Sequence, residues 1–481
     1  IHGRALTKND SNRSLSNPGM PKNKDLLTEK PSRRHGVWRS IFPDPLIPHS
    51  GRERNRYLLK NLLLHFRPLT VPEKTLMFSL TWGLGGMAAV LILLQFGTGL
   101  LLKFAYEPNP VTAYSSIQVL QNDVTFGQLV RNLHHWGANL LVLIVFLHML
   151  RVYFTGAFLP PRQFNWIIGL GLFGLVLFAN LTGYLLPYDQ LAFWAVTVST
   201  GMLEYIPAIG TRLQEMIRGG PEIGPASLRI FYALHTAVVP MALVFFMAFH
   251  FWRIRKAGGL VIPRKPGEAI ETAPSRVSTV PNLLLRESVV AMMLIAVVML
   301  MAVFFDAPLG DPANPSLSPN PTKAPWYFAG LQEMLLHLHP MFSVFFIPLL
   351  IVTGLLCLPY IRYQSDTQGI WFVSSTGRRL AVWASISTAI VTPLLILIDD
   401  LIIETGSLHF GLPPQISNGL IPVALISFVV SGVYFIAKRR FATANNEAIQ
   451  SVVIVLLTAF IVLTATSVWF RGQGMVLVWL F

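Results

Sequence analysis

The chain has 481 residues, of which 53% are apolar and only 12% are charged, a composition that excludes a soluble protein of this length. Its formal net charge of +14 would suit a nucleic-acid partner. The basic residues, however, gather before the first apolar segment and after alternate later ones, which excludes nucleic-acid binding and predicts an all-α polytopic membrane protein.

The N-terminal segment, residues 1–70, is polar and rich in Pro, Asn and Arg, which predicts an extension with a poorly ordered beginning. Within this extension, Val37 to Phe42 could lie in the membrane interface as a short amphipathic helix. Its many arginines place the extension and the N-terminus on the cytoplasmic or matrix side by the positive-inside rule.

Apolar runs long enough to cross the hydrocarbon core follow one another along the rest of the chain. We expect about nine spans, near residues 75–104, 130–153, 165–187, 228–252, 284–305, 340–361, 380–402, 420–437 and 449–469. Pro393 and Pro422 make the seventh and eighth hardest to delimit, because a kinked helix resembles two short ones. The only cysteine, Cys357, lies in the sixth span, where we expect a small buried side chain.

Two of these spans carry histidines at matching intervals. His134 and His148 are fourteen residues apart in the second span, and His235 and His250 are fifteen apart in the fourth. Such intervals place each pair on roughly one helix face, about 21 Å apart along the axis. Because the two spans run in the same direction, His134 and His235 share the outer depth, and His148 and His250 the inner one.

A single intramembrane histidine most often makes a hydrogen bond between helices. Four at two matched depths favour bis-imidazole ligation of two metal centres. With neither carboxylates nor cysteines at those depths, the natural metal is haem iron, and the sequence predicts two b-type haems in a four-helix bundle. The first and third spans carry glycines at the same fourteen-residue interval, which would admit a porphyrin edge: Gly85, Gly99, Gly169 and Gly183.

Arg131 and Arg151 flank the second span at its two ends. Either guanidinium could pair with a haem propionate or extend to the lipid headgroups. The residues themselves leave both possibilities open.

Several longer motifs resemble cytochrome b of the Rieske/cytochrome b complexes, above all the chloroplast and bacterial type: RNLHHWGAN (131–139), TGYLLPYDQLAFWAVTV (182–198), HFWRIRKAGG (250–259), QFGTG (95–99) and PTKAPWYFAGLQE (321–333). The resemblance covers roughly residues 60–362. It implies a dihaem domain over 71–262, a C-terminal cytochrome b domain over 263–375 and additional membrane helices over 376–481. It also selects His134 over its neighbour His135 as a ligand and adds Gly137 to the cofactor-binding residues.

The sequence departs from this family at two places. Gly83-Leu84-Gly85-Gly86 stands where chloroplast relatives have the cysteine that tethers a third haem, so we expect no covalent haem c. Ala324-Pro325-Trp326-Tyr327 stands where relatives have P-E-W-Y at the outer quinol site, so the usual glutamate is missing. Its role as proton acceptor would pass to one of three residues, Glu333, Asp189 or Tyr327. Trp326 would contact the quinol, although Glu333 could equally be a solvated loop carboxylate.

The resemblance implies a quinol oxidoreductase. Quinol would be oxidised at the outer face, with one electron passing to a Rieske iron–sulfur protein and on to a cytochrome c-type subunit. The other would cross through the two haems to a quinone at the inner face. There the family places cationic and acidic groups that match Arg255, Lys256 and Glu287, unless these are only charges at helix ends.

Such a protein would be a homodimer in a multi-subunit complex of a bacterial-type energy-coupling membrane. The main alternative is a dihaem membrane anchor that passes quinol electrons to a peripheral oxidoreductase without splitting them. A transporter that moves protons through intramembrane histidines is a more distant one.

Overall fold

The computed structural model describes residues 70–265, 267–268, 274–279, 281–363, 368–403 and 411–478. The predicted interfacial helix Val37–Phe42 and all but the last residue of the N-terminal extension lie outside these residues. Within them the fold is almost entirely helical, with one two-stranded antiparallel sheet in which β1 (Thr70–Pro72) pairs with β2 (Arg276–Ser278) in the register Thr70 to Ser278.

The main helices follow one another as α3 (Phe78–Thr81), α4 (Leu84–Lys103), α5 (Ala113–Asn122), α6 (Gly127–Phe154), α7 (Gln163–Tyr184), α8 (Gln190–Gly201), α9 (Gly210–Arg218), α10 (Pro225–Ala233), α11 (Val239–Lys256), α12 (Asn282–Phe304), α13 (Trp326–His337), α14 (Ile347–Cys357), α15 (Ser375–Ile398), α16 (Ile421–Arg439) and α17 (Asn445–Ala465). Single π-type turns extend several of them: η3 (Leu234–Val238), η4 (Phe342–Phe346), η6 (Asp399–Ile403), η8 (Ile416–Leu420) and η9 (Thr466–Phe470).

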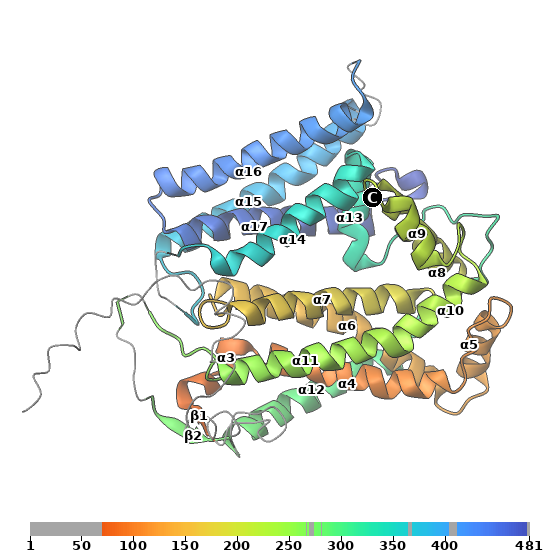
Figure 1. The fold of residues 1–481 in the computed structure, drawn as a ribbon, viewed down its shortest axis with the longest axis horizontal. Coiled ribbons are helices and arrows are strands. Elements are labelled where there is room, and N and C mark those ends of the chain that lie inside the picture. Colours follow the sequence, from red (N-terminus) through yellow and green to blue (C-terminus); the bar gives the residue numbers. More distant parts are fainter. Residues whose placement is uncertain are drawn as a thin grey trace, which may run out of the picture.

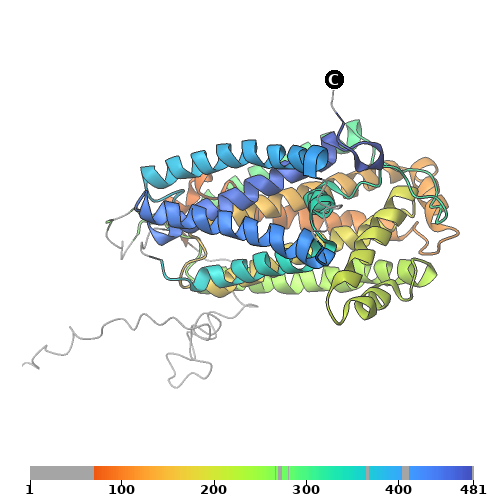
Figure 2. The same cartoon turned by 90° about the horizontal axis from the view of Figure 1, so that it is seen from above.

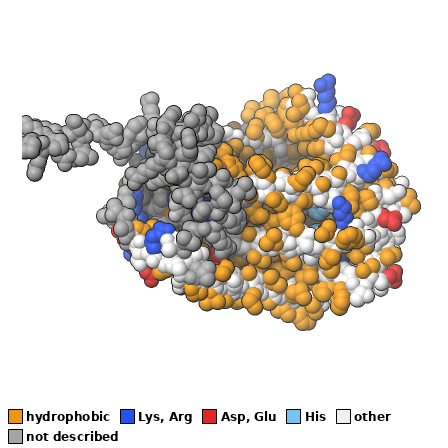
Figure 3. Space-filling view, turned by 60° about the horizontal axis from the view of Figure 1, so that its bottom comes forward, with side chains coloured by type: hydrophobic (Ala, Val, Ile, Leu, Met, Phe, Trp, Pro, Cys, Tyr) orange, Lys and Arg blue, Asp and Glu red, His pale blue; other side chains and the backbone are white. Residues whose placement is uncertain are grey.

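In the described part of the chain, nine helical segments are long and apolar enough to cross a membrane: Leu84–Lys103, Gly127–Phe154, Gln163–Tyr184, Pro225–Lys256, Asn282–Phe304, Phe342–Tyr360, Ser375–Ile403, Ile416–Arg439 and Asn445–Phe470. They run side by side along the long axis (Figures 1 and 2). On the face shown in Figure 3, hydrophobic side chains cover most of the middle. The prediction of an all-α polytopic membrane protein is confirmed.

The prolines do not divide the spans in which they occur. Pro393 lies inside α15, and Pro422 lies in the first turn of α16, directly after the π-type turn η8, so its missing backbone N–H falls where the helical hydrogen-bond pattern changes. The predicted start of the first span at residue 75 is wrong. Trp82 and Gly83 adopt the left-handed conformation, which ends α3 and makes the long helix begin at Leu84.

Four helices form the bundle that the histidine pattern predicts. α4 packs on α6, α6 on α7, and α7 on α11, while α12 covers α4 and α6. One buried cluster draws side chains from all five helices, including Leu91, Val142, Val176, Leu243 and Val298. The bundle is therefore one closely packed unit.

The C-terminal helices form a second group. α17 packs against α15, α16 and α13, and Figure 1 shows α14 to α17 together on the side of the molecule away from α4 and α12. Cys357, at the end of α14, is exposed on the protein surface, so the expected burial is wrong. Most of α14 turns outward, and apolar side chains of a membrane span need no protein partner there.

Candidate functional site

The four predicted histidine ligands come together in two pairs, between α6 on one side and the continuous helix of η3 and α11 on the other. The rings of His134 and His235 have centroids 6.0 Å apart, nearly perpendicular to each other. His148 and His250 lie close enough to interact electrostatically. Since each of these two helices supplies one histidine to each pair, the intervals of fourteen and fifteen residues in sequence correspond to two levels in space.

Each of these histidines faces one of the predicted glycines. A Cβ atom built on Gly99 would lie 3.1 Å from His134 Cε1, and one built on Gly183 would lie 2.5 Å from His235 Cε1. At the other level, the corresponding distances are 3.2 Å from Gly85 to His148 and 3.5 Å from Gly169 to His250. The glycines of α4 and α7 thus clear the space beside each imidazole, as a flat ring between four helices requires.

Hydrogen bonds orient the two imidazoles of the outer pair. His134 Nδ1 lies 2.9 Å from Thr98 Oγ1, and His235 Nδ1 lies 2.9 Å from the Ala179 carbonyl oxygen. With Nδ1 engaged in this way, Nε2 is the nitrogen left for a metal. Sequence reasoning missed Thr98, and also Thr182, whose hydroxyl lies 3.4 Å from His235 Nδ1. The signal was present, because a threonine precedes both outer glycines.

The two arginines that flank the second span are buried, so neither extends to the headgroups. Arg131 donates to the carbonyl oxygens of Ala307 and Pro308, both at 2.7 Å, and so fixes the loop after α12. Arg151 Nε donates to the Leu80 carbonyl oxygen, while its buried Nη2 has no hydrogen-bond partner within the described ranges. A buried unpaired cation beside the inner histidine level suits a haem propionate.

Neither Gly137 nor His135 faces the paired histidines. A Cβ atom on Gly137 would meet the side-chain amide of Gln95 on α4, so this glycine lets α4 and α6 approach each other. His135 lies against the Trp136 ring and near Asn139. These contacts agree with the selection of His134 as ligand, whereas a cofactor role for Gly137 stays a prediction.

The beginning of α13 lies beside the half of α6 that contains His134. Trp326 Nε1 donates to Asn139 Oδ1 at 2.9 Å, and Tyr327 packs against the bundle's buried cluster. Burial raises the pKa of Tyr327 well above its ordinary value. The phenol therefore stays protonated, and it can donate a hydrogen bond rather than serve as a proton acceptor.

Asp189 is buried at the start of α8, where its carboxylate already has partners. Oδ1 accepts from the Ala192 N–H at 2.8 Å, and Oδ2 accepts from the Gly310 N–H at 2.9 Å. The first bond caps α8 and the second ties the loop between α12 and α13 to it. Asp189 therefore stabilises the local fold.

Glu333 is not a solvated loop carboxylate, so that alternative is wrong. The APWY segment leads directly into α13, and Glu333 on this helix is 0% exposed. It accepts from Arg471 Nε at 2.9 Å and from Arg471 Nη2 at 2.5 Å. Burial raises the pKa of Glu333, but the hydrogen bonds from His337 and Arg471 outweigh burial, and the pKa lies below its ordinary value.

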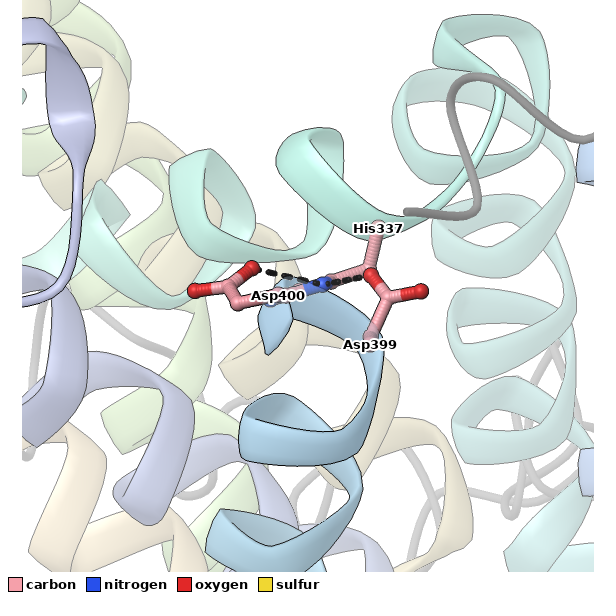
Figure 4. Close-up of side chains that lie close together, drawn as sticks. All are labelled: His337, Asp399 and Asp400. Carbon is pink, nitrogen blue, oxygen red and sulfur yellow. Dashed lines mark hydrogen bonds and ion pairs between the residues drawn. The ribbon is translucent and has the colours of Figure 1, made fainter. Parts of the chain in front are cut away.

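Sequence reasoning missed the charged cluster around Glu333. His337 Nδ1 lies 2.5 Å from Asp399 Oδ2 and 3.9 Å from Asp400 Oδ1, as Figure 4 shows, and Arg471 Nη1 lies 2.5 Å from Asp400 Oδ2. His337, Asp399 and Asp400 could surround a metal ion. Arg471 Nη1 already pairs with Asp400 Oδ2, so this carboxylate has a cationic partner without a metal ion.

The residues predicted for the inner site lie at the opposite end of the bundle from α13. Arg255 and Lys256 end α11, and Glu287 lies in the second turn of α12 at the same end (Figure 1). Arg255 Nη1 is buried without a hydrogen-bond partner in the described ranges, and Lys256 Nζ lies 5.6 Å from the centroid of the Trp252 ring. Arg255 thus has a buried N–H group that a ligand could engage.

The chain is similar in sequence and in fold to known proteins. The family model described as cytochrome b/b6/petB matches residues 70–258. Cytochrome b6 of Synechococcus elongatus is 43% identical over 175 residues, which is 36% of this chain and 81% of that protein. Cytochrome b6 of Synechococcus sp. strain RCC307 is 44% identical over 175 residues, covering 36% and 80% of the two chains.

A solved structure titled "Hyperthermophilic respiratory Complex III" contains a chain of similar fold. Its TM-score is 0.56 at 23% identity, and the match covers 86% of this chain and 97% of that chain. The similarity therefore extends beyond the family model's range into the C-terminal helices, as a similarity of fold.

Proposed function

The chain belongs to the cytochrome b/b6 family, and from this we propose that it is the cytochrome b subunit of a quinol oxidoreductase that carries two b haems. The observation that supports this most strongly is the pairing of four histidines with four glycines at two levels of one bundle. When bound, the haems would carry single electrons between a quinol site at the outer end and a quinone site at the inner end.

The chain's own residues prepare both haem positions. His134 with His235 would hold the outer iron, and His148 with His250 the inner one, as neutral imidazoles. Thr98 and the Ala179 carbonyl fix the outer ring orientations. Arg151 offers its unpaired Nη2 to a carboxylate at the inner level.

One prediction concerns the glycines. Gly183→Val would place side-chain atoms on the His235 ring, because a Cβ alone would lie 2.5 Å from Cε1. We expect loss of the outer haem signal from the redox difference spectrum with the inner one retained. Gly171→Val on the same helix is the control, since a Cβ there meets nothing within 4 Å. Equal spectra for the two variants would refute the glycine assignment.

At the outer end, Trp326 and Tyr327 of α13 lie beside α6 and can position a quinol, with the Tyr327 hydroxyl as hydrogen-bond donor. At the inner end, Arg255 with Lys256 and Glu287 would supply charge and protons to a quinone that gains electrons. In this arrangement the N-terminus is cytoplasmic, and protons are taken up inside and released outside.

A second prediction concerns Arg255. Arg255→Leu should slow reoxidation of the inner haem by quinone, because the cation that stabilises negative charge on the quinone is lost. The haem spectrum should not change. Arg255→Lys keeps the charge and should retain most of the rate. Stopped-flow absorbance measures both variants, and unchanged reoxidation in Arg255→Leu would remove Arg255 from the site.

The proposal includes partners and a division of the chain. A Rieske iron–sulfur protein and a cytochrome c-type subunit would receive the other electron in a dimeric complex of a bacterial energy-coupling membrane. Residues 71–262 hold the haems, 263–375 complete the outer site, and 376–481 add membrane helices. The subunit inventory of the purified complex tests this, since a dihaem anchor would copurify with a peripheral oxidoreductase instead of a Rieske protein.

A further inference from the structure

The charged cluster between α13 and the C-terminal helices runs from the protein interior to its surface. Glu333 has a side chain that is 0% exposed, His337 one that is 14% exposed, and Asp399 and Asp400 ones that are 15% and 21% exposed. In the predicted topology these aspartates lie at the outer end of the seventh span. The cluster thus connects a buried carboxylate to the outer surface.

His337 bridges the two ends of this path. Its Nε2 lies 3.3 Å from Glu333 Oε1, and its Nδ1 lies 2.5 Å from Asp399 Oδ2. An imidazole with a carboxylate oxygen at each ring nitrogen can take up a proton on one side and release a different one on the other. That is the geometry of a proton relay.

Charge favours protons at this position. In the described part of the chain, the charged groups that face His337 are the carboxylates Glu333, Asp399 and Asp400, with Arg471 as the cation, its Nη2 lying 3.3 Å from His337 Nε2. Among the residues that the structure describes, three carboxylates face one guanidinium, so they carry net negative charge together whether His337 is neutral or protonated. Burial lowers the pKa of His337, but Glu333 and Asp399 outweigh it and the pKa lies above its ordinary value.

A cavity adjoins the same imidazole. It has a volume of about 170 Å³ and is lined by polar groups of His337, His339 and Asn418 among apolar neighbours. Asn418 is only 8% exposed, and its Oδ1 is buried without a hydrogen-bond partner in the part of the chain that the structure describes. A space of this size with polar lining and an unsatisfied acceptor can hold several waters. Water can therefore reach His337.

We propose that His337 carries protons from the outer quinol site to the outer surface, between Glu333 and Asp399. This inference rests on the proposed function, which places quinol at the beginning of α13, about 10 Å along that helix from Glu333. Each quinol O–H bond that breaks releases one proton, and the electrons would leave by the haem and iron–sulfur routes of the proposed function. One proton enters at the Nε2 side of His337, and one leaves from Nδ1 to Asp399 and on to water.

Arg471 has a separate part in this arrangement. Because it keeps the pKa of Glu333 low, a proton does not stay on that carboxylate and moves on to the imidazole. The C-terminal segment after α17 thus supplies a cation to the helix that carries Trp326 and Tyr327. The additional membrane helices acquire a function that the sequence alone did not suggest.

The test is steady-state quinol oxidation by the intact complex across a pH range. His337→Gln keeps the size and hydrogen bonding of the side chain but cannot relay a proton, so the rate should fall at least about tenfold. The pH dependence of the parent should flatten, and both haem spectra should be unchanged. His339→Gln is the matched control, because its ring lines the same cavity and, among the described residues, contacts the Tyr205 ring rather than a carboxylate; its rate should stay within about twofold of the parent.

If the complex with His337→Gln does not assemble, Asp399→Asn tests the relay instead. This variant removes the proton acceptor at the exposed end of the path and should slow quinol oxidation in the same way. A parent-like rate and pH profile in the assembled variant would refute the relay. A parent complex that oxidises no quinol would instead refute the proposed function. If His339→Gln slowed quinol oxidation as much as His337→Gln, the effect would be structural and the relay would also be refuted.

Discussion

Alanine at His148 or His250 should remove the inner haem, and alanine at His134 or His235 should remove the outer one. The bis-imidazole arrangement leaves no second protein ligand when one ring is lost, so an absorption band should disappear rather than shift. Redox difference spectra of purified complex measure this. A substitution in one histidine pair should leave the absorption spectrum of the haem at the other pair unchanged.

His135→Ala is the control for this experiment, because His135 points to Trp136 and Asn139 instead of to a glycine. Its spectrum should match that of the parent. Loss of a haem in His135→Ala with both haems kept in His134→Ala would mean that the assigned register is wrong by one residue.

The second large effect should come from Arg471→Met. Glu333 would then be a fully buried carboxylate without its guanidinium partner, a change that typically costs 3–5 kcal/mol. We expect a lower thermal midpoint and loss of quinol oxidation, because α13 carries Trp326 and Tyr327. Thermal unfolding of the purified complex, followed with the oxidation rate, measures both.

The double variant Glu333→Gln/Arg471→Met separates stability from proton transfer. This double variant has no charge on either side chain of the pair, so it should recover most of the stability that Arg471→Met loses. If Glu333 takes part in proton transfer, the rate should stay low in this variant and in Glu333→Gln alone. A rate within about twofold of the parent, on the order of 0.4 kcal/mol in barrier, would remove Glu333 from the proton route.

The effect of pH on this ion pair has a definite sign. Because the pKa of Glu333 in the folded protein lies below its ordinary value, the pair stabilises the fold above the unfolded value of about 4.3. That contribution is lost as the pH falls through the folded pKa. The difference in thermal midpoint between parent and Arg471→Met should therefore shrink in acid.

The sequence predicted the bundle with two histidine levels because local periodicity determines it. The intervals from His134 to His148 and from Gly85 to Gly99 translate directly into helix faces and depths. The structure adds the partner of each ring, such as Thr98 and the Ala179 carbonyl, which depend on how helices rotate against one another.

The charged cluster around Glu333 could not be predicted from periodicity. Glu333, Asp399 and Arg471 lie more than sixty residues apart in sequence, and no periodicity relates one helix end to another. In sequence, Glu333 therefore resembles a loop carboxylate, whereas in the structure it is paired with Arg471 of the segment after α17. The exposure of Cys357 could not be predicted either, since an apolar sequence does not distinguish the lipid-facing side of a helix from the protein-facing side.

The central claim is that quinol electrons separate at the outer site, and an oxidant pulse tests it most directly. Purified complex is mixed with quinol, in the Arg255→Leu background where the inner haem should empty slowly, and an oxidant of the high-potential partner is then added. If electrons separate, each quinol that reduces the partner also reduces a b haem, so the haem absorbance should rise when oxidant is added. A fall in reduced haem upon the pulse would show a single unbranched electron path and contradict the account.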